Sequence, residues 1–151
     1  HMTSYAPLLA KEKHTQWSPD LIYFNNREVK PTTGYYVQKL YGQNAGSHYI
    51  PSQIILDNQD NRVKLRIGSS IVRDSKTGDV IVKLVNLLPV SVETEIQLPG
   101  IGSVQPSAVR TVLAGAPEST PLPVTDTIEV GANFKQQLPA YSFTVIRLKT
   151  K

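Results

Sequence analysis

This chain of 151 residues contains no cysteine. It also lacks the motifs typical of metal-binding and nucleotide-binding proteins. Without cysteine, neither a disulfide framework nor a thiolate metal site can form. The three histidines, His1, His14 and His48, show no ligand-like spacing, so we predict no metal site. No Walker-type or dinucleotide-binding motif occurs, and we therefore expect no nucleotide cofactor and no other cofactor.

Long apolar runs and blocks of one charge are also missing. No apolar run approaches the ~18 residues that a membrane-spanning helix needs. The 16 basic and 12 acidic residues are spread along the chain, without the basic clusters that favour nucleic acid. No signal-peptide pattern is present, so we expect any targeting signal to lie outside this sequence. These absences predict a globular protein with neither a membrane nor a nucleic-acid partner.

From about Ser52 onward the pattern is that of β-strands, because apolar residues recur at every second position between Gly and Pro punctuation. A turn is predicted at Gly78, followed by a strand over 80–88. That strand is apolar on both faces apart from Lys83 and Asn86, which is typical of a central strand covered on both sides. Further strands are predicted at 90–98, 108–113, 124–130 and 141–148, without helical periodicity. The spacing favours an antiparallel sandwich, and the side chains predicted to point inward are Leu65, Ile67, Val82, Leu84, Val92, Ile96, Ile128, Phe143 and Val145.

The first 50 residues have a mixed α and β pattern. Residues 21–24 form a continuous apolar run, and a helix is predicted from 31–33 to a stop at Gly42. Residues 2–10 fit either one face of a helix or the end of a strand, although Pro7 weakens a helix interior. The tyrosines at helical spacing are more typical of a packing face than of a platform for stacking sugar rings; they are Tyr35, Tyr36 and Tyr41.

Three stretches resemble, in order and spacing, the closing part of the catalytic barrel in family 51 glycoside hydrolases, the α-L-arabinofuranosidases. They are SYAPLLA at 4–10, WSPDLIYFN at 17–25 and YYVQKLY at 35–41. Two further stretches, KLVN at 83–86 and LPAYSFTVIRL at 138–148, are similar to the C-terminal β-sandwich of the same family. The resemblance implies a mainly β fold: residues 1–46 as an α/β segment from the last unit of a (β/α)8 barrel, and residues 47–151 as a jelly-roll-like antiparallel sandwich.

The same resemblance implies that this chain is an accessory region and is not catalytic alone. The family removes terminal arabinofuranosyl groups with retention of configuration, using two glutamates that precede the position of Ser4. Retaining chemistry needs two carboxylates about 5 Å apart. The carboxylates that this chain does contain lie on polar strand faces or beside a turn and make no such pair; they include Glu93, Glu95, Glu129, Asp74 and Asp79.

The implied partners are the catalytic barrel of the same enzyme and, through it, an arabinose-containing polysaccharide. Such a substrate suggests an extracellular or periplasmic location. The alternative is a stand-alone carbohydrate-binding or structural β-sandwich. A sugar-binding sandwich would need exposed planar aromatic side chains, and beyond residue 50 the only aromatic residues are Phe134, Tyr141 and Phe143.

The candidate substrate-binding residues are Trp17, Asp20 and Gln16. The resemblance places residues 11–20 in a loop over the face of the barrel that carries active sites. Trp17 either lines a sugar subsite there or closes an apolar cluster with residues 21 and 23, and Asp20 and Gln16 are either ligands or solvated loop residues. Family members carry a substrate-binding glutamine two positions after this tryptophan, where this chain has Pro19.

The apolar side chains of the N-terminal segment would need partners outside the sandwich. We expect the segment to fold back, to pair with another copy as a homo-oligomer, or to join a separate catalytic fragment. On this interpretation, a version that begins at Ser52 should behave better than the full chain. The side chains concerned are Leu8, Leu9, Leu21, Ile22, Tyr23 and Phe24.

Overall fold

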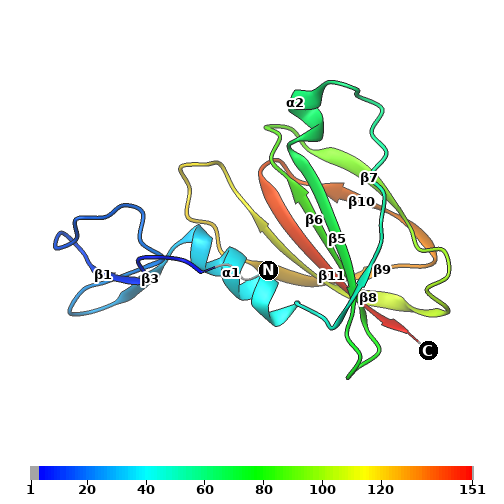
Figure 1. Ribbon diagram of the computed structural model, residues 1–151, viewed down its shortest axis with the longest axis horizontal. Helices are drawn as coiled ribbons and strands as arrows, with labels where there is room; N and C mark the ends of the chain where they lie inside the picture. The colour runs from blue at the N-terminus through cyan, green and yellow to red at the C-terminus, as the bar shows by residue number, and fades with distance from the viewer. Residues whose placement is uncertain (1–3, 151) are drawn as a thin grey trace.

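A six-stranded antiparallel sheet forms the centre of the molecule in a computed structural model that describes residues 4–150 (Figure 1). Its strand order is β4-β5-β6-β11-β8-β9, so the last strand of the chain pairs with both β6 and β8. The strands of this sheet are β4 (His48–Ile50), β5 (Ile67–Arg73), β6 (Val80–Asn86), β8 (Val104–Ala114), β9 (Val124–Glu129) and β11 (Ser142–Thr150).

One face of this sheet is covered by a two-stranded antiparallel sheet made of β7 (Val92–Gln97) and β10 (Asn133–Leu138). Alternate side chains of the central strands point to this face because successive residues of a strand face opposite ways. The two sheets thereby form the predicted antiparallel sandwich. The buried residues between them are Val80, Val82, Leu84, Ile96, Leu98, Ala108, Leu138, Ile146 and Leu148.

The opposite face of the six-stranded sheet is covered by helix α1 (Thr33–Gln43). Leu40 is the buried residue of the helix, and Tyr36 and Val37 pack beside it. Tyr41 stacks on Phe143 with ring centroids 4.6 Å apart, so the packing interpretation is confirmed for Tyr36 and Tyr41. Strand β6 is therefore covered on both sides, as its composition predicts. The sheet residues under the helix are Val72, Ile81, Leu113, Phe143 and Val145.

Polar contacts hold the C-terminal end of α1 on the same face. Lys83 is 4% exposed, and its Nζ donates to the backbone oxygen of Asn44, the C-cap residue, at 2.7 Å. Burial lowers the pKa of Lys83. Arg147 donates to the side chain of Asn44 and to Asp79, which is almost fully buried. Cations at a helix C-terminus interact favourably with its dipole, so these contacts fix where α1 ends on the sheet.

The N-terminal sheet stands beyond α1 at one end of the molecule (Figure 1). It contains β1 (Leu9–Lys11), β2 (Ile22–Phe24) and β3 (Val29–Pro31), with β1 and β2 parallel and β2 and β3 antiparallel. The hydroxyl of Thr32 ties this sheet to α1, because it donates to the backbone oxygen of Leu21 and caps the helix at the backbone N–H of Tyr35. Of the two alternatives for residues 2–10, the structure has strand β1 at the end of this segment and no helix among the described residues 4–10.

Two sequence predictions about the sandwich are wrong. Leu65 is 84% exposed, because α2 (Asn61–Lys64) interrupts the alternation and Leu65 is its C-cap, so helical structure does occur after Ser52. Asp60 starts this short helix by accepting from the N–H of Arg62. Of the other eight predicted inward residues, Val82, Leu84, Ile96, Phe143 and Val145 are buried and Ile67, Val92 and Ile128 are half-buried.

Strand β10 has no counterpart among the predicted strands. The inward positions of β10 are Phe134, Gln136 and Leu138. Because the middle one is a polar glutamine, the sequence shows no apolar alternation there. Gln136 is only 8% exposed and accepts from Arg110 at 2.8 Å, which satisfies its amide oxygen in the interior. A hydrogen-bond partner on another strand therefore makes a polar residue suitable for an inward position.

The structure reverses the expectation for a version that begins at Ser52. Helix α1 and β4 both precede that residue, and both belong to the sandwich: α1 covers one sheet face and β4 pairs with β5. Removing them would uncover apolar side chains of the central sheet. The proposed boundary between residues 46 and 47 remains a prediction, because α1 on one side of it packs on strands from the other side.

The ion pair between β8 and β9 predicts an acid-dependent loss of stability. Arg110 hydrogen bonds to Asp126, and this bond holds the pKa of Asp126 below its ordinary value of 3.8. A carboxylate with a lowered pKa in the folded state stabilises it above the ordinary pKa, and this contribution disappears as the pH falls through and below that value. We expect Asp126→Asn to lose less stability than the wild type between about pH 5 and about pH 3, measured by urea unfolding. The exposed Asp57→Asn serves as control, and an unchanged pH profile in D126N would contradict the assignment.

Candidate functional site

The loop that connects β1 to β2, residues 12–21, carries all three candidate binding residues. Asp20 lies at its end and is fully buried, with 0% exposure. The hydroxyl of Thr15 lies 3.2 Å from Asp20 Oδ2, and the backbone N–H of Asp20 donates to the Tyr23 hydroxyl at 2.9 Å. Asp20 is therefore enclosed by its own loop and by β2, and its carboxylate does not reach the surface.

Trp17 and Gln16 lie on the outside of the same loop. Trp17 is 68% exposed, and its backbone N–H donates to Thr15 Oγ1 at 3.1 Å. Gln16 is exposed beside it. This exposure excludes the interpretation in which Trp17 closes an apolar cluster with Leu21 and Tyr23. The structure thus gathers Trp17 and Gln16 on one accessible loop and separates them from Asp20. A sugar contact for any of the three remains a prediction.

A polar network lies at the carboxyl ends of β1 and β2, and the sequence analysis did not identify it. Glu12 accepts from Asn25 Nδ2 and from Lys30 Nζ, both at 2.8 Å, and Glu28 lies 3.0 Å from the same Lys30 nitrogen. The hydrogen bonds from Lys30, and next those from Asn25, lower the pKa of both glutamates. Glu12 and Lys30 are 18 positions apart, so only the pairing of β2 with β1 and with β3 indicates their contact.

The two faces of the β1–β2 pair have different environments. On one face Ala10 and Leu21 are buried, and a side chain added at Gly34 in α1 would lie 3.5 Å from Leu21 Cδ1. On the other face Leu9 is 63% exposed and Phe24 36% exposed. Among the residues that the structure describes, β1 pairs with β2 alone, so its second edge is open. The β1–β2 pair therefore has both exposed apolar side chains on one face and an unpaired edge at β1.

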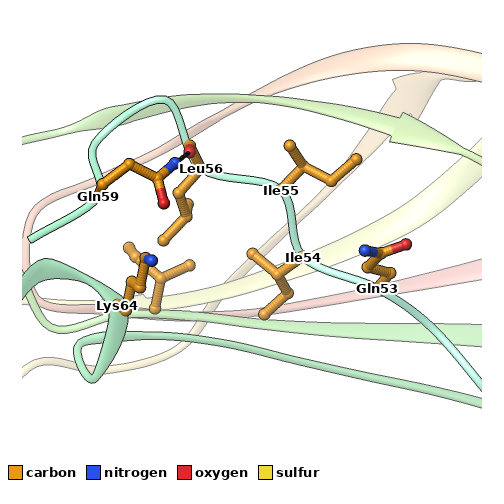
Figure 2. Close-up of a pocket in the computed structure, with 7 residues that line it drawn as sticks. Gln53, Ile54, Ile55, Leu56, Gln59 and Lys64 are labelled. Carbon is orange, nitrogen blue, oxygen red and sulfur yellow. Dashed lines mark hydrogen bonds between the residues drawn. The ribbon is translucent and has the colours of Figure 1, made fainter. Parts of the chain in front are cut away.

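Two hollows lie on the sandwich, away from this loop. One, of about 330 Å³, is formed by the segment before α2 and by Lys64 of α2, and Figure 2 shows Ile54 and Leu56 with the side chain of Gln59, which donates to the Leu56 oxygen. The other, of about 430 Å³, lies between α1 and the β8–β9 loop and is mainly apolar. Within residues 4–150 we find no group of His, Asp and Glu arranged to hold a metal ion. No helix in this part of the chain is long and apolar enough to cross a bilayer.

The family model and the curated relatives indicate one family. The family model described as "Alpha-L-arabinofuranosidase C-terminal domain" matches residues 1–142. A probable α-L-arabinofuranosidase A of Aspergillus terreus is 30% identical over 156 aligned positions, which cover 96% of this chain and 23% of that protein. An extracellular exo-α-L-arabinofuranosidase of Streptomyces chartreusis is 50% identical over 52 residues, 34% of this chain and 6% of that protein.

Solved structures show the same relationship. An arabinose-bound α-L-arabinofuranosidase superposes with a TM-score of 0.84 and 32% identity, covering 98% of this chain and 24% of that one. The α-L-arabinofuranosidase of Thermotoga maritima in an arabinose complex shares the fold, with a TM-score of 0.69 and 14% identity over 85% of this chain and 31% of that one. The chain spans less than a quarter of the two curated relatives. The predicted mainly β fold and the resemblance to family 51 glycoside hydrolases are thereby confirmed. The chain belongs to the α-L-arabinofuranosidase C-terminal domain family.

Proposed function

We propose that this chain is the C-terminal part of a retaining α-L-arabinofuranosidase, in which the N-terminal sheet completes the catalytic barrel and the sandwich braces it. The observation that carries the proposal is the parallel β1–β2 pair, which has an open edge and is followed by a helix packed on the sandwich. Parallel strands covered by helices are the repeating unit of a (β/α)8 barrel. The catalytic barrel of the same enzyme is the partner that such an edge would join.

The two faces of the β1–β2 pair support this partner. Each barrel strand presents one face to the surrounding helices and one to an interior filled by layers of apolar side chains. Leu21 lies on the face next to α1, while Leu9 and Phe24 lie on the other face and are exposed. Preceding barrel strands would cover these two side chains. Without such strands, each large exposed apolar side chain forgoes about 1.5–3 kcal/mol of burial.

The position of the β1–β2 loop supports a role at the rim of the active site. Barrel active sites lie at the carboxyl ends of the strands, and this loop begins directly after the carboxyl end of β1. We propose that Trp17 and Gln16 contact an arabinofuranosyl-containing polysaccharide there. An exposed tryptophan offers an apolar ring and an N–H donor, both of which suit a sugar.

The carboxylates of the chain support a non-catalytic role. A retaining glycosidase needs one carboxylic acid whose pKa is raised so that it can donate a proton. Glu12 and Glu28 flank Lys30, and its hydrogen bonds lower the pKa of both. Asp74 and Asp79 both face Arg147 in ion pairs. Neither glutamate has the raised pKa that a general acid needs, so we propose that the catalytic pair lies in the barrel partner.

The alternative of a stand-alone carbohydrate-binding sandwich receives less support. Such modules present exposed planar aromatic side chains on one face. On the strands of the sandwich and their turns, Phe143 is buried under α1, Phe134 and Tyr141 are half-buried, and Tyr49 on β4 is a single exposed ring, at 65%. Trp17, which is exposed, lies in the β1–β2 loop of the N-terminal sheet. A stand-alone sandwich would not require that sheet.

The proposal predicts complementation. We expect the chain alone to give no turnover of 4-nitrophenyl α-L-arabinofuranoside. Mixed with the barrel portion of a family α-L-arabinofuranosidase truncated before the matching residues, it should restore hydrolysis. Leu9→Asp should abolish this restoration because it places a charge on the exposed face of β1.

Leu122→Asp is the matched control, since Leu122 is 66% exposed on a loop of the sandwich. Turnover by the purified chain alone would contradict the non-catalytic role. Equal restoration by the L9D and L122D variants would contradict the barrel interface.

A further inference from the structure

Asp20 is a buried carboxylate whose interactions leave one oxygen unsatisfied. It has 0% exposure, and within the described part of the chain its Oδ1 has no hydrogen-bond partner. Its other oxygen, Oδ2, lies 3.2 Å from a single hydroxyl, that of Thr15. Burying a polar atom without a partner is costly, and a carboxylate costs more than a neutral group. An apolar residue at this position would avoid that cost, so the carboxylate calls for an explanation.

Thr15 connects the buried carboxylate to the exposed tryptophan. Its Oγ1 accepts from the backbone N–H of Trp17 at 3.1 Å and lies within 3.2 Å of both the Trp17 oxygen and Asp20 Oδ2. A hydroxyl has one proton, so donation to Asp20 leaves its lone pairs directed at the Trp17 N–H. The competing acceptor is the Trp17 oxygen, and donation to it would leave Asp20 Oδ2 without a hydrogen-bond partner among the described residues.

The opposite side of Asp20 is attached to the sheet. Its backbone N–H donates to the Tyr23 hydroxyl, and the neighbouring N–H of Leu21 donates to the backbone oxygen of Pro7. Asp20 therefore joins a fixed strand pair to a loop whose outer residues, Gln16 and Trp17, are exposed. The chain of contacts runs from β2 through Asp20 and Thr15 to the backbone of Trp17.

We propose that Asp20 is a positioning residue, which orients the Thr15 hydroxyl and thereby holds Trp17 in place, and that it makes no contact with sugar itself. The catalytic relevance of this role rests on the function proposed above for Trp17. The positioning itself is independent of that function, because all of its contacts lie within this chain.

Trp17 is the only tryptophan of the chain, so its indole signals report on this loop alone. We expect Asp20→Leu and Thr15→Val to accelerate amide hydrogen exchange at Trp17 by about tenfold, the effect of losing one hydrogen bond. Fluorescence anisotropy of Trp17 should fall in both variants. Thr15→Ser keeps the hydroxyl and should behave as wild type, and Asp57→Leu, which makes the same substitution at an exposed position, is the matched control.

A second measurement separates this inference from the proposed function. In a complete enzyme of this family into which the chain is substituted, D20L should raise KM for an arabinofuranoside severalfold and change kcat less. Unchanged exchange and anisotropy in D20L and T15V would overturn the positioning role. Altered exchange and anisotropy with an unchanged KM would leave that role standing and contradict the sugar contact of Trp17.

Discussion

A version of the chain that begins at Ser52 is expected to be largely unfolded or self-associated, whereas a version that begins at Pro31 should unfold cooperatively as a monomer. The version that begins at Pro31 keeps α1, its N-cap Thr32 and β4. It loses the N-terminal sheet except for Pro31, the last residue of β3. The shorter one uncovers the apolar face under α1, which includes Ile81 at 0% and Val145 at 3% exposure.

The size of the effect follows from the side chains that lose cover. Each large apolar residue forgoes about 1.5–3 kcal/mol when it is exposed, and five buried sheet residues lie under α1. Partial exposure of all five approaches the ~5–15 kcal/mol by which a whole domain is stable. Sedimentation and thermal unfolding measured by circular dichroism would show the difference between the two versions.

A point variant isolates the contribution of helix packing. Leu40 is the buried residue of α1, and Leu40→Ala should lower the free energy of unfolding by about 2–5 kcal/mol. Lys39→Ala, at an exposed position of the same helix, should change it little. If the Ser52 version were a monomer that melts as high as the full chain, α1 would not be part of the domain core.

The second large effect is expected for Asn86→Asp, at the end of β6. Asn86 has 0% exposure, and its Nδ2 lies 2.8–3.3 Å from the backbone oxygens of Val90, Leu138 and Pro139. Its Oδ1 accepts from the N–H of Leu88 at 3.0 Å. This amide therefore joins β6 to the chain entering β7 and to the end of β10, which belong to the opposing sheet.

Aspartate has the same shape and no donor, so it would place a carboxylate against three carbonyl oxygens. We expect a loss of at least about 3 kcal/mol, since each unsatisfied buried group costs about 1–3 kcal/mol. The midpoint of thermal unfolding should then fall by about 6–12 °C. Asn133→Asp, at an exposed position of β10, is the control and should change the midpoint little.

The pH dependence of this variant gives an independent check. Burial against carbonyl oxygens raises the pKa of a carboxyl group, so the folded state of N86D should take up a proton more readily than the unfolded chain. A folded-state pKa above the unfolded value stabilises the protein at low pH, and this contribution is lost as the pH rises. N86D should therefore lose less stability, relative to wild type, at about pH 4 than at about pH 7. A variant as stable as wild type at both pH values would show that the Asn86 contacts are not needed.

The sequence by itself determined the elements whose periodicity is strong. Apolar patterns typical of strands predicted β6, β7 and β11, and helical spacing with a Pro–Thr start and a Gly stop predicted α1 to within two residues. The two-sided apolar character of 80–88 predicted a strand covered on both faces, and the structure confirms it. The resemblance of the motifs to the C-terminal region of the arabinofuranosidase family is confirmed as well, while the assignment of residues 1–46 to the last barrel unit stays a prediction.

Only the tertiary structure decided which elements lie against one another and which polar residues are buried. Gln136 in β10 is inward because Arg110 from β8 meets its amide, and Asp20 is enclosed because Thr15 and Tyr23 surround it. Neither pairing follows from local spacing, since hydrogen-bond partners are selected by proximity in space. For the same reason α1, which the sequence assigns to the N-terminal segment, is part of the sandwich core: its cover of Ile81 is a contact between residues far apart in the chain.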